Sequence, residues 1–238
     1  MELLPAGRIR LVETAPPGLS PQHRSLMDRR WAEAVRANPA LFDGPVAALT
    51  GLARDGSDGL VLSWARATYR CRTLRGVPDA PVLCSLFVSV VQPCPDGRVL
   101  VGRMSASTAT PGRWQLPGGT LEPPPADAGL DGTSLRLHAA RELAEETGSD
   151  TPADALTPWL TTRSARGSVG VLFLAPPRPA HELRADYARL VSQETARGAD
   201  PEFDRVELIG SPADLARLPG PRTDYLEPVL RHYTRTSP

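Results

Sequence analysis

The most constraining feature of the chain is an acidic segment that ends at a glycine. Residues 139–148 read Ala-Ala-Arg-Glu-Leu-Ala-Glu-Glu-Thr-Gly, which is typical of a helix with a glycine stop. Because side chains three and four residues apart share one face of a helix, Glu142, Glu145 and Glu146 are expected to lie on one stripe. The residues expected on the opposite, buried face are Leu137, Ala140, Ala144 and Thr147, with Leu143 on its flank.

Three neighbouring carboxylates favour a cation. Like charges at this spacing repel by about 0.2–0.5 kcal/mol per pair, so they require neutralisation by a metal ion or by arginines. Carboxylate oxygens suit Mg²⁺ or Mn²⁺ better than zinc, and no His/Cys cluster competes for the role. The alternative is a solvated acidic helix face, and the helix alone does not exclude it.

A second segment upstream makes a ligand site the better interpretation. Residues 112–122 read Gly-Arg-Trp-Gln-Leu-Pro-Gly-Gly-Thr-Leu-Glu. A short strand that ends in Pro-Gly-Gly lets the backbone approach a ligand closely and leaves its amides and carbonyls free. The chain therefore carries two candidate parts of one site.

Taken together, the two segments resemble the Nudix hydrolase family. The family pattern places Trp-x-x-Pro-Gly-Gly and a Glu before Arg-Glu-hydrophobic-any-Glu-Glu-any-Gly. The chain matches the first part from Trp114 to Glu122 and the second from Arg141 to Gly148. The resemblance implies an α/β fold, a Nudix α/β/α sandwich, and an enzyme that hydrolyses a nucleoside diphosphate linked to another moiety.

Two departures from the pattern matter. A Pro-rich insertion lies between Glu122 and Gly132, which aligns with the second glycine of the family pattern. Thr133 stands where the family usually carries its first Glu. Either another residue supplies that carboxylate, or three suffice, or activity is lost. His138, one turn before Glu142, either assists the acidic stripe or is simply solvated.

The resemblance also implies roles for individual residues. Glu142, Glu145 and Glu146 are expected to bind Mg²⁺, with Mn²⁺ as a substitute, and the backbone carbonyl of Gly118 or Gly119 is expected to add a ligand. Arg141 is expected to pair with Glu145 and orient it. The general base is expected to be Glu202 or Glu146. The residues expected to contact substrate are Arg103, Gly118, Gly119 and Phe42. The Asn38–Pro45 segment around Phe42 by itself favours a helix stop followed by a turn over a ligand contact.

For the substrate, the insertion, the missing Glu and the N-terminal extension resemble the UDP-glucose and UDP-galactose diphosphatase subgroup. The resemblance implies cleavage of a UDP-sugar to UMP and a sugar 1-phosphate. Two alternatives stay open: hydrolysis of ADP-ribose or another nucleoside diphosphate derivative, and a non-catalytic Nudix-fold sensor of nucleotide sugars. The sequence does not reveal the oligomeric state, and the resemblance is compatible with a homodimer because many relatives pair.

Composition narrows the partners further. The formal net charge is zero, which argues against nucleic acid polymers held by counterion release and favours a small anionic ligand. All 27 basic residues are arginine, whose planar fork suits phosphate. The three cysteines match no zinc site, the N-terminus has no signal-peptide order, and the apolar run at 83–91 is too short to cross a bilayer. A cytoplasmic protein without a membrane partner is expected.

The chain is expected to divide at 76–81, where turn residues separate an N-terminal α+β extension (1–80) from a Nudix domain (81–238). In the extension we expect a strand at 8–13, a helix at 20–37 capped by Ser20, and strands within 59–74. In the second part the expected strands are 83–91, 98–103, 159–163, 168–174 and 205–210. The expected helices after the acidic one are 181–197 and two short ones, the first capped by Ser211.

Overall fold

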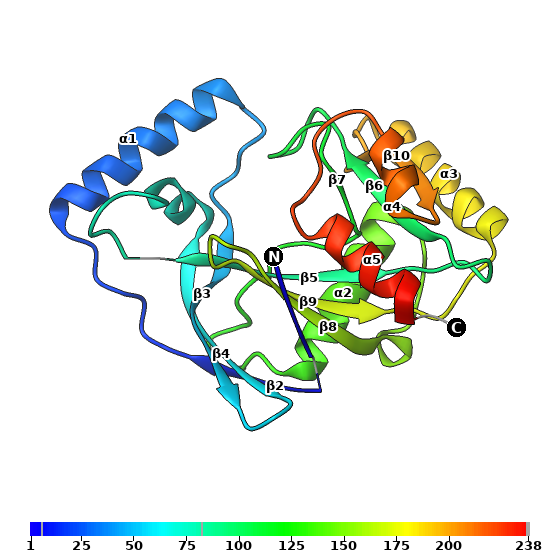
Figure 1. Ribbon diagram of the computed structural model, residues 1–238. Coiled ribbons are helices and arrows are strands. Elements are labelled where there is room, and N and C mark those ends of the chain that lie inside the picture. The colour runs from blue at the N-terminus through cyan, green and yellow to red at the C-terminus, as the bar shows by residue number, and fades with distance from the viewer. Residues whose placement is uncertain (6, 82, 237–238) are drawn as a thin grey trace.

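The computed structural model describes residues 1–5, 7–81 and 83–236 (Figure 1). The strands are β1 (Glu2–Pro5), β2 (Arg8–Glu13), β3 (Pro45–Asp55), β4 (Gly59–Thr68), β5 (Cys84–Val91), β6 (Val99–Met104), β7 (Trp114–Gln115), β8 (Thr157–Arg163), β9 (Val169–Leu174) and β10 (Phe203–Ile209). The helices are α1 (Pro21–Ala37), α2 (Gly132–Thr147), α3 (Ala180–Ala196), α4 (Pro212–Arg217) and α5 (Leu226–Thr236), with 3-10 helices η1 (Tyr69–Leu74) and η2 (Ala153–Ala155).

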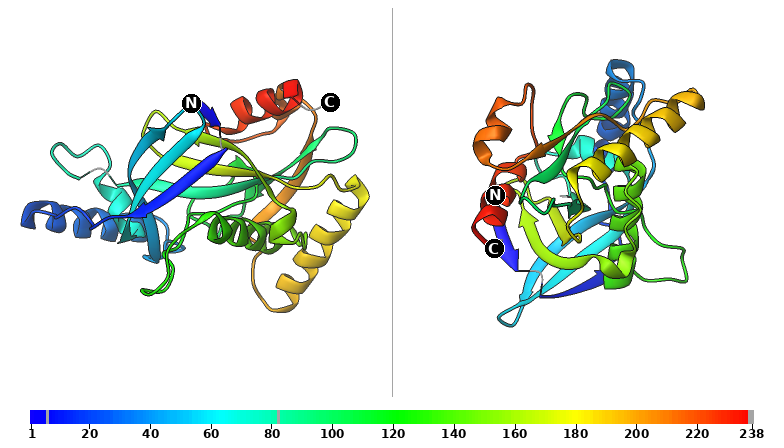
Figure 2. Two further views of the ribbon diagram at one scale, coloured as in Figure 1. Left: turned by 90° about the horizontal axis from the view of Figure 1, so that it is seen from below. Right: turned by 90° about the vertical axis from the view of Figure 1, so that its right-hand side faces the viewer.

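The strands of the described residues form two sheets. The larger has seven strands in the order β1-β8-β9-β5-β3-β4-β2, and the smaller has the order β10-β6-β7. β5 and β9 run parallel at the centre of the larger sheet. In the left view of Figure 2, α2 lies on one side of this sheet and α5 on the other. The predicted α/β class and the helix–sheet–helix layering are confirmed.

Alternation along β5 explains the two layers. Leu86, Val88 and Val90 are fully buried in a core that they share with the buried face of α2. Val91, at the end of the strand, belongs instead to a second core that includes Val229 of α5. Because successive strand side chains point to opposite faces, one strand supplies both cores. Each buried Leu or Val contributes about 1.5–3 kcal/mol, so β5 anchors α2 firmly against the sheet.

The N-terminal segment continues the same sheet. β3 pairs antiparallel with β5 at Ala48↔Ser85 and Leu49↔Cys84, and with β4 along most of its length. α1 packs on η1, as Figure 1 shows. Among the described residues of α1, Met27 is the one buried side chain. The division into 1–80 and 81–238 stays a prediction, and the sheet runs across it.

Several local expectations are confirmed and others are corrected. α1 begins at Pro21, and the Ser20 side chain accepts a hydrogen bond from the His23 amide at 3.1 Å, as expected of the cap. Residues 69–74 form η1 instead of a strand. β3 was not expected because its sequence, Pro-Val-Ala-Ala-Leu-Thr-Gly-Leu-Ala-Arg-Asp, is rich in weak strand formers. Pairing with β4 on one side and β5 on the other compensates for that low propensity.

None of the helices in the described residues is both long and apolar enough to cross a membrane.

Candidate active site

The acidic helix forms as predicted, but its buried face differs. α2 is capped by Asp131, whose side chain accepts a hydrogen bond from the Ser134 amide at 2.7 Å, and it ends at Gly148 in the left-handed conformation. Leu137, expected inside, is 58% exposed. The residues buried on α2 are Leu135, Ala139, Leu143, Glu146 and Thr147. The apolar stripe follows 135, 139 and 143, so Glu146, three residues after Leu143, lies on the buried face with it.

Glu146 therefore differs from Glu145 in its surroundings, because it lies in the protein interior while Glu145 is largely exposed. It is fully buried, and one oxygen, Oε2, accepts a hydrogen bond from the Gly118 amide at 2.6 Å. Its other oxygen, Oε1, has no hydrogen-bond partner among the described residues. Burial, and secondarily repulsion from Glu202, raise the pKa of Glu146 well above its usual range. A buried carboxylate with a free oxygen is primed to take a cation or a proton.

The two glycines of the Pro-Gly-Gly segment are required by close approach. Gly118 has φ +149°, and a Cβ there would collide with the backbone carbonyl of Val88 on β5. A Cβ on Gly119 would collide with the carboxylate of Glu142. The first glycine thus lets the segment lie on the sheet, and the second lets α2 bring its carboxylate against the segment.

The carbonyls of this segment are not equivalent. Pro117 and Gly119 accept hydrogen bonds from the amides of Val90 (2.8 Å) and Val88 (3.0 Å). Within the described part of the chain, the carbonyl of Gly118 accepts only from the Gln115 side chain, at 3.4 Å. Of the two carbonyls expected as ligands, that of Gly118 is the more available.

Glu142 and Arg141 belong to a small polar cluster on the outer side of α2. A carboxylate oxygen of Glu142 lies 2.9 Å from His138 Nε2, and both side chains are largely buried. Arg141 lies 3.5 Å from Glu142, 3.6 Å from Glu122 and 3.9 Å from Glu145. The expected Arg141–Glu145 contact is present but long, and Arg141 contacts three carboxylates instead of orienting one. Glu145 itself is 61% exposed.

Glu202 reaches the same region from just before β10. Its backbone carbonyl accepts a hydrogen bond from the Ser105 amide at 2.8 Å, which holds the residue beside the end of β6. The side chain keeps contact with solvent on a cavity wall. Surrounding protein atoms raise the pKa of Glu202, and the charges of Glu142 and Glu145 raise it further. The mutual repulsion shows that these carboxylates share one electrostatic environment.

The donor set fits a hard divalent cation in its chemistry. It consists of carboxylate oxygens, one of them unpartnered in the protein interior, and a weakly bonded backbone carbonyl. Across the described ranges, however, no three His, Cys, Asp or Glu side chains are gathered closely enough to hold one ion. Glu142 and Glu145 would have to turn toward Glu146 and Gly118 to share a metal.

Thr133 and most of the insertion lie at the protein surface. Thr133 is exposed in the first turn of α2. The insertion is tied to the N-terminal segment, because Arg66 on β4 donates to the carbonyls of Pro124 (2.6 Å) and Pro125 (3.2 Å). The extension therefore supports the loop that leads into the acidic helix.

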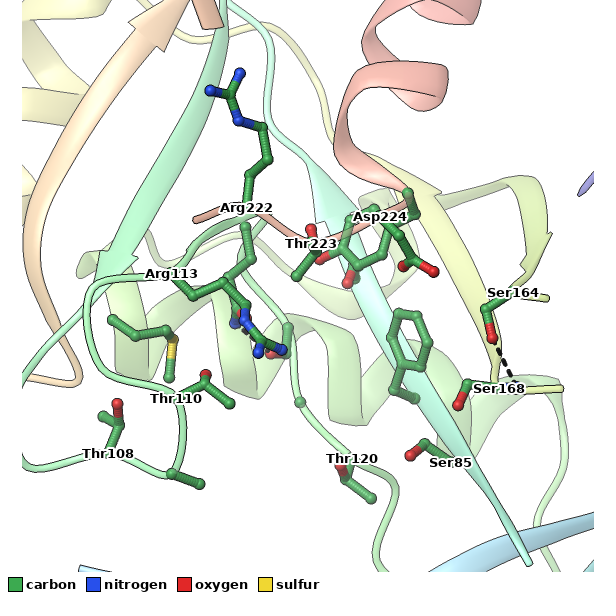
Figure 3. Close-up of a pocket in the computed structure, with 18 of the residues that line it drawn as sticks. Ser85, Thr108, Thr110, Arg113, Thr120, Ser164, Ser168, Arg222, Thr223 and Asp224 are labelled. Atoms are coloured by element: carbon green, nitrogen blue, oxygen red, sulfur yellow. Dashed lines mark hydrogen bonds between the residues drawn. The ribbon is translucent and has the colours of Figure 1, made fainter. Parts of the chain in front are cut away.

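A large cavity opens beside these groups (Figure 3). Its volume is about 900 Å³, and Gly118, Gly119 and Glu202 line it. In Figure 3, Thr108, Thr110 and Arg113 lie on one side and Ser85, Ser164 and Ser168 on the other. Phe87 and Tyr225 also line it, with their rings stacked 5.6 Å apart. The cavity is large enough for a nucleotide derivative.

Comparison with known proteins identifies the family. The model of the NUDIX domain matches residues 87–233. The chain belongs to the Nudix family. Among curated protein sequences, none matches it.

Solved structures of Nudix proteins are similar at low identity. A putative Nudix hydrolase from Chromobacterium violaceum is 20% identical over 64% of this chain and 77% of its own, with a TM-score of 0.37. A MutT protein from Methanosarcina mazei Go1 is 18% identical over 63% and 93%, with a TM-score of 0.42. A Nudix hydrolase from Alicyclobacillus acidocaldarius is 17% identical over 64% and 91%, with a TM-score of 0.41.

Family membership makes the protein a pyrophosphohydrolase of the Nudix type. Nudix hydrolases act on small nucleoside diphosphate derivatives and generally use divalent metals such as Mg²⁺.

Two expected substrate contacts lie outside the Nudix cavity. Arg103 on β6 makes a two-pronged ion pair with Asp204, at 2.7 and 3.1 Å, and is not among the lining residues. Phe42 is 79% exposed and covers Gly44 instead of the cavity. The structure thus groups Gly118, Gly119, Glu142, Glu146 and Glu202 and leaves these two apart.

Sequence reasoning did not single out the arginines that line the cavity. Arg72 precedes the predicted boundary, in a stretch expected to be strand, and Arg113 stands next to Trp114 in the matched Nudix segment. Because Arg113 lies only a few residues before the Pro-Gly-Gly motif, the sequence could have indicated it as a residue of the site. For Arg72 no local signal exists, because only the fold of η1 brings it to the cavity.

Proposed function

We propose that the protein is a Mg²⁺-dependent Nudix hydrolase that cleaves the diphosphate of a UDP-sugar to UMP and a sugar 1-phosphate. The observation that carries the metal dependence is the buried Glu146, whose Oε1 is unpartnered while its Oε2 accepts from the amide of Gly118, a residue with a weakly bonded carbonyl. UDP-sugars are favoured by the resemblance of the insertion and the extension to the UDP-sugar diphosphatase subgroup. Mn²⁺ is expected to substitute for Mg²⁺.

In this proposal the carboxylates hold the metal and the substrate diphosphate lies against Gly118 and Gly119. Glu142, Glu145 and Glu146 are the side-chain ligands, and the Gly118 carbonyl adds one from the backbone. When bound, the metal neutralises phosphate oxygens and polarises the phosphorus under attack. Arg141 holds Glu142 and Glu145 near the site by its contacts at 3.5 and 3.9 Å.

Glu202 is the better of the two candidate bases. Glu146 is fully buried and already bonded to the Gly118 amide, whereas Glu202 lines the cavity and keeps contact with solvent. A raised pKa brings a carboxylate closer to neutral pH, where it accepts a proton more readily. Glu202 takes the proton of the attacking water, and the water oxygen bonds to one phosphorus. The bond from that phosphorus to the bridging oxygen breaks, and the bridging oxygen keeps the electron pair and leaves as part of the other monophosphate, so that UMP and a sugar 1-phosphate are released.

The aromatic pair supplies a surface for the base. Phe87 lines the cavity, is half-buried and is backed by Tyr225. A planar uracil can stack on such a ring. Because Phe42 lies outside the cavity, we propose Phe87 as the stacking residue of this chain.

The test is incubation with nucleoside diphosphate sugars and Mg²⁺, with chromatographic detection of the released monophosphate. We expect UMP from UDP-glucose or UDP-galactose, and loss of at least about 100-fold in kcat for Glu146→Gln. Glu33→Gln, which neutralises an exposed carboxylate on α1, is the matched control. UMP release that persists in Glu146→Gln would refute the assignment.

Two alternatives are decided by the same panel. Preferential release of AMP from ADP-ribose would assign a different nucleotide. Thr133 in place of a family Glu, and the separation of the three carboxylates, favour a non-catalytic sensor; binding of UDP-sugar without any turnover at saturating Mg²⁺ would establish that function. A homodimer and a cytoplasmic location stay predictions.

A further inference from the structure

The cavity wall formed by η1 carries arginines without acidic partners. Arg72 and Arg75 both line the cavity, and neither has a carboxylate within ion-pair distance among the described residues. Arg70 in the same 3-10 helix is different, because it pairs with Asp28 and Asp43 at 3.2 Å each. Within η1, Arg70 is neutralised by carboxylates, whereas Arg72 and the residue that follows η1, Arg75, carry charges that such groups do not neutralise.

Neutral partners hold both guanidinium groups in place. Arg75 donates to the hydroxyl of Ser85 at 2.7 Å and to that of Ser168 at 3.3 Å, both through Nη2. Arg72 donates to the Thr120 hydroxyl at 2.9 Å and stacks on the Tyr69 ring at 4.2 Å. Hydroxyls and an aromatic ring fix the positions of the groups but leave their charges uncompensated, so several N–H donors remain available.

The two charges also act on each other. Surrounding protein atoms lower the pKa of Arg75, and the charge of Arg72 lowers it further. This repulsion between the two cations is relieved when an anion binds to them.

Arg72 and Arg75 together form what we call the arginine wall of the cavity. The arginine wall is adjacent to the proposed diphosphate site but does not coincide with it. Thr120, which holds Arg72, directly follows Gly119, while Ser85, which holds Arg75, lies at the start of β5. Figure 3 shows Ser85 and Ser168 together on the side of the cavity opposite Thr108 and Thr110. A substrate with its diphosphate at Gly118 and Gly119 can therefore extend one end toward Arg75.

We propose that Arg72 and Arg75 bind a second oxyanion, a carboxylate or a phosphate, carried by the substrate outside its scissile diphosphate. This inference rests on the proposed function and narrows its substrate class. The favoured substrates are nucleoside diphosphate derivatives with an acidic group, such as a sugar acid, in preference to those with a neutral sugar. Two guanidinium groups that line the same cavity match the several oxygens of such a group.

The test compares ligands that differ by one anionic group. Isothermal titration calorimetry without metal is performed with UDP-glucose against UDP-glucuronate, which differ in a carboxylate, and NAD against NADP, which differ in a phosphate. We expect the wild-type protein to bind the acidic member of at least one pair about tenfold or more tightly, the effect of one charged hydrogen-bonded contact. The pair that shows the preference distinguishes a carboxylate from a phosphate.

Variants then assign the preference to the residues. Arg75→Gln and Arg72→Gln should each reduce it to less than about threefold while leaving affinity for the neutral member unchanged. Arg184→Gln, which removes an exposed arginine on α3 away from the cavity, should retain it. Equal wild-type affinities within both pairs, or variants that weaken both members alike, would overturn the inference. The readout needs no turnover, so loss of the proposed hydrolysis and loss of this preference are separate results.

Discussion

Glu146 Oε2 accepts a hydrogen bond from the amide of Gly118 at 2.6 Å, across a separation of 28 residues. This contact joins the acidic helix to the Pro-Gly-Gly segment, the two parts of the chain on which the family resemblance rests. It also turns one oxygen of a fully buried carboxylate toward the backbone and leaves the other without a partner. The site is thus already connected in the protein alone, but with a charge that the interior solvates poorly.

The stability of the metal-free protein should fall as pH rises from the acidic range. Glu146 has a raised pKa in the folded state, so the folded protein binds its proton more tightly than the unfolded chain does. The loss of stability caused by ionising Glu146 inside the protein is absent below the unfolded pKa of about 4.3 and grows as pH rises above that value. Glu146→Gln should therefore raise the thermal midpoint in EDTA at pH 8 by about 2–4 °C, equivalent to about 1 kcal/mol, and change it little at pH 4.

Thermal unfolding at both pH values checks this, with Glu33→Gln as the control. A midpoint that is equally lowered at pH 4 and pH 8 would mean that Glu146 serves only as a hydrogen-bond partner of Gly118. Addition of Mg²⁺ at pH 8 should stabilise the wild-type protein more than Glu146→Gln, because the ion replaces the missing countercharge.

Gly118 and Gly119 should separate stability from activity. In Gly118→Ala the new methyl group meets the backbone of Val88 and the positive φ is strained, so we expect a loss of about 1–3 kcal/mol in the free energy of unfolding. In Gly119→Ala the nearest atoms to the new methyl group are those of the Glu142 carboxylate, the end of a side chain that can rotate away. That variant should fold with nearly wild-type stability and lose at least about tenfold in kcat.

Urea denaturation of Gly118→Ala and Gly119→Ala measures the change in stability, and steady-state kinetics of the same two variants measures the change in activity. The interpretation of Glu142 as a ligand held against Gly119 is wrong if Gly119→Ala keeps full activity at limiting Mg²⁺.

The pairing of Pro-Gly-Gly with the acidic helix could be predicted because its evidence is local. The glycine pair, the spacing of the glutamates and the Ser20 capping position can each be recognised within a short stretch of sequence. The burial of Glu146 beside an exposed Glu145 could not be predicted from the spacing of the glutamates. It depends on which rotation of α2 gives the best packing of Leu135, Ala139 and Leu143 on β5, and the helix has apolar residues on more than one side.

The arginine wall could not be predicted from the sequence for a different reason. Alternation over 59–74 continues past Thr68, but the chain turns into η1 at Tyr69, where Arg70 can pair with Asp28 and Asp43. Those partners lie 27 or more residues away in the sequence. Likewise Arg103 could not be separated from the site without knowing that Asp204 faces it across β6 and β10.

Arg66 should control the order of the insertion. Its guanidinium donates to the carbonyls of Pro124 and Pro125 and pairs with Glu13 at 2.8 Å. Arg66→Ala should therefore increase cleavage within 123–131 by thermolysin several-fold, with little change in global stability because the contacts lie near the surface. Arg10→Ala on neighbouring β2 removes an exposed arginine and is the control. Unchanged cleavage in Arg66→Ala would show that other contacts hold the loop.

Glu202→Gln should reveal the general base in the pH dependence of hydrolysis. Because surrounding protein and the charges of Glu142 and Glu145 raise the pKa of Glu202, activity should fall on the acidic side at a pH above the usual carboxyl range of about 4.3. Glu202→Gln should lower kcat by about 100- to 10,000-fold and remove that acidic limb, with a much smaller effect on KM. Glu207→Gln, on the strand that follows, keeps the limb in place if the effect is specific to Glu202. If Glu202→Gln retains an unshifted acidic limb at reduced kcat, the titrating base is another group, and Glu146, whose pKa is also raised, becomes the candidate.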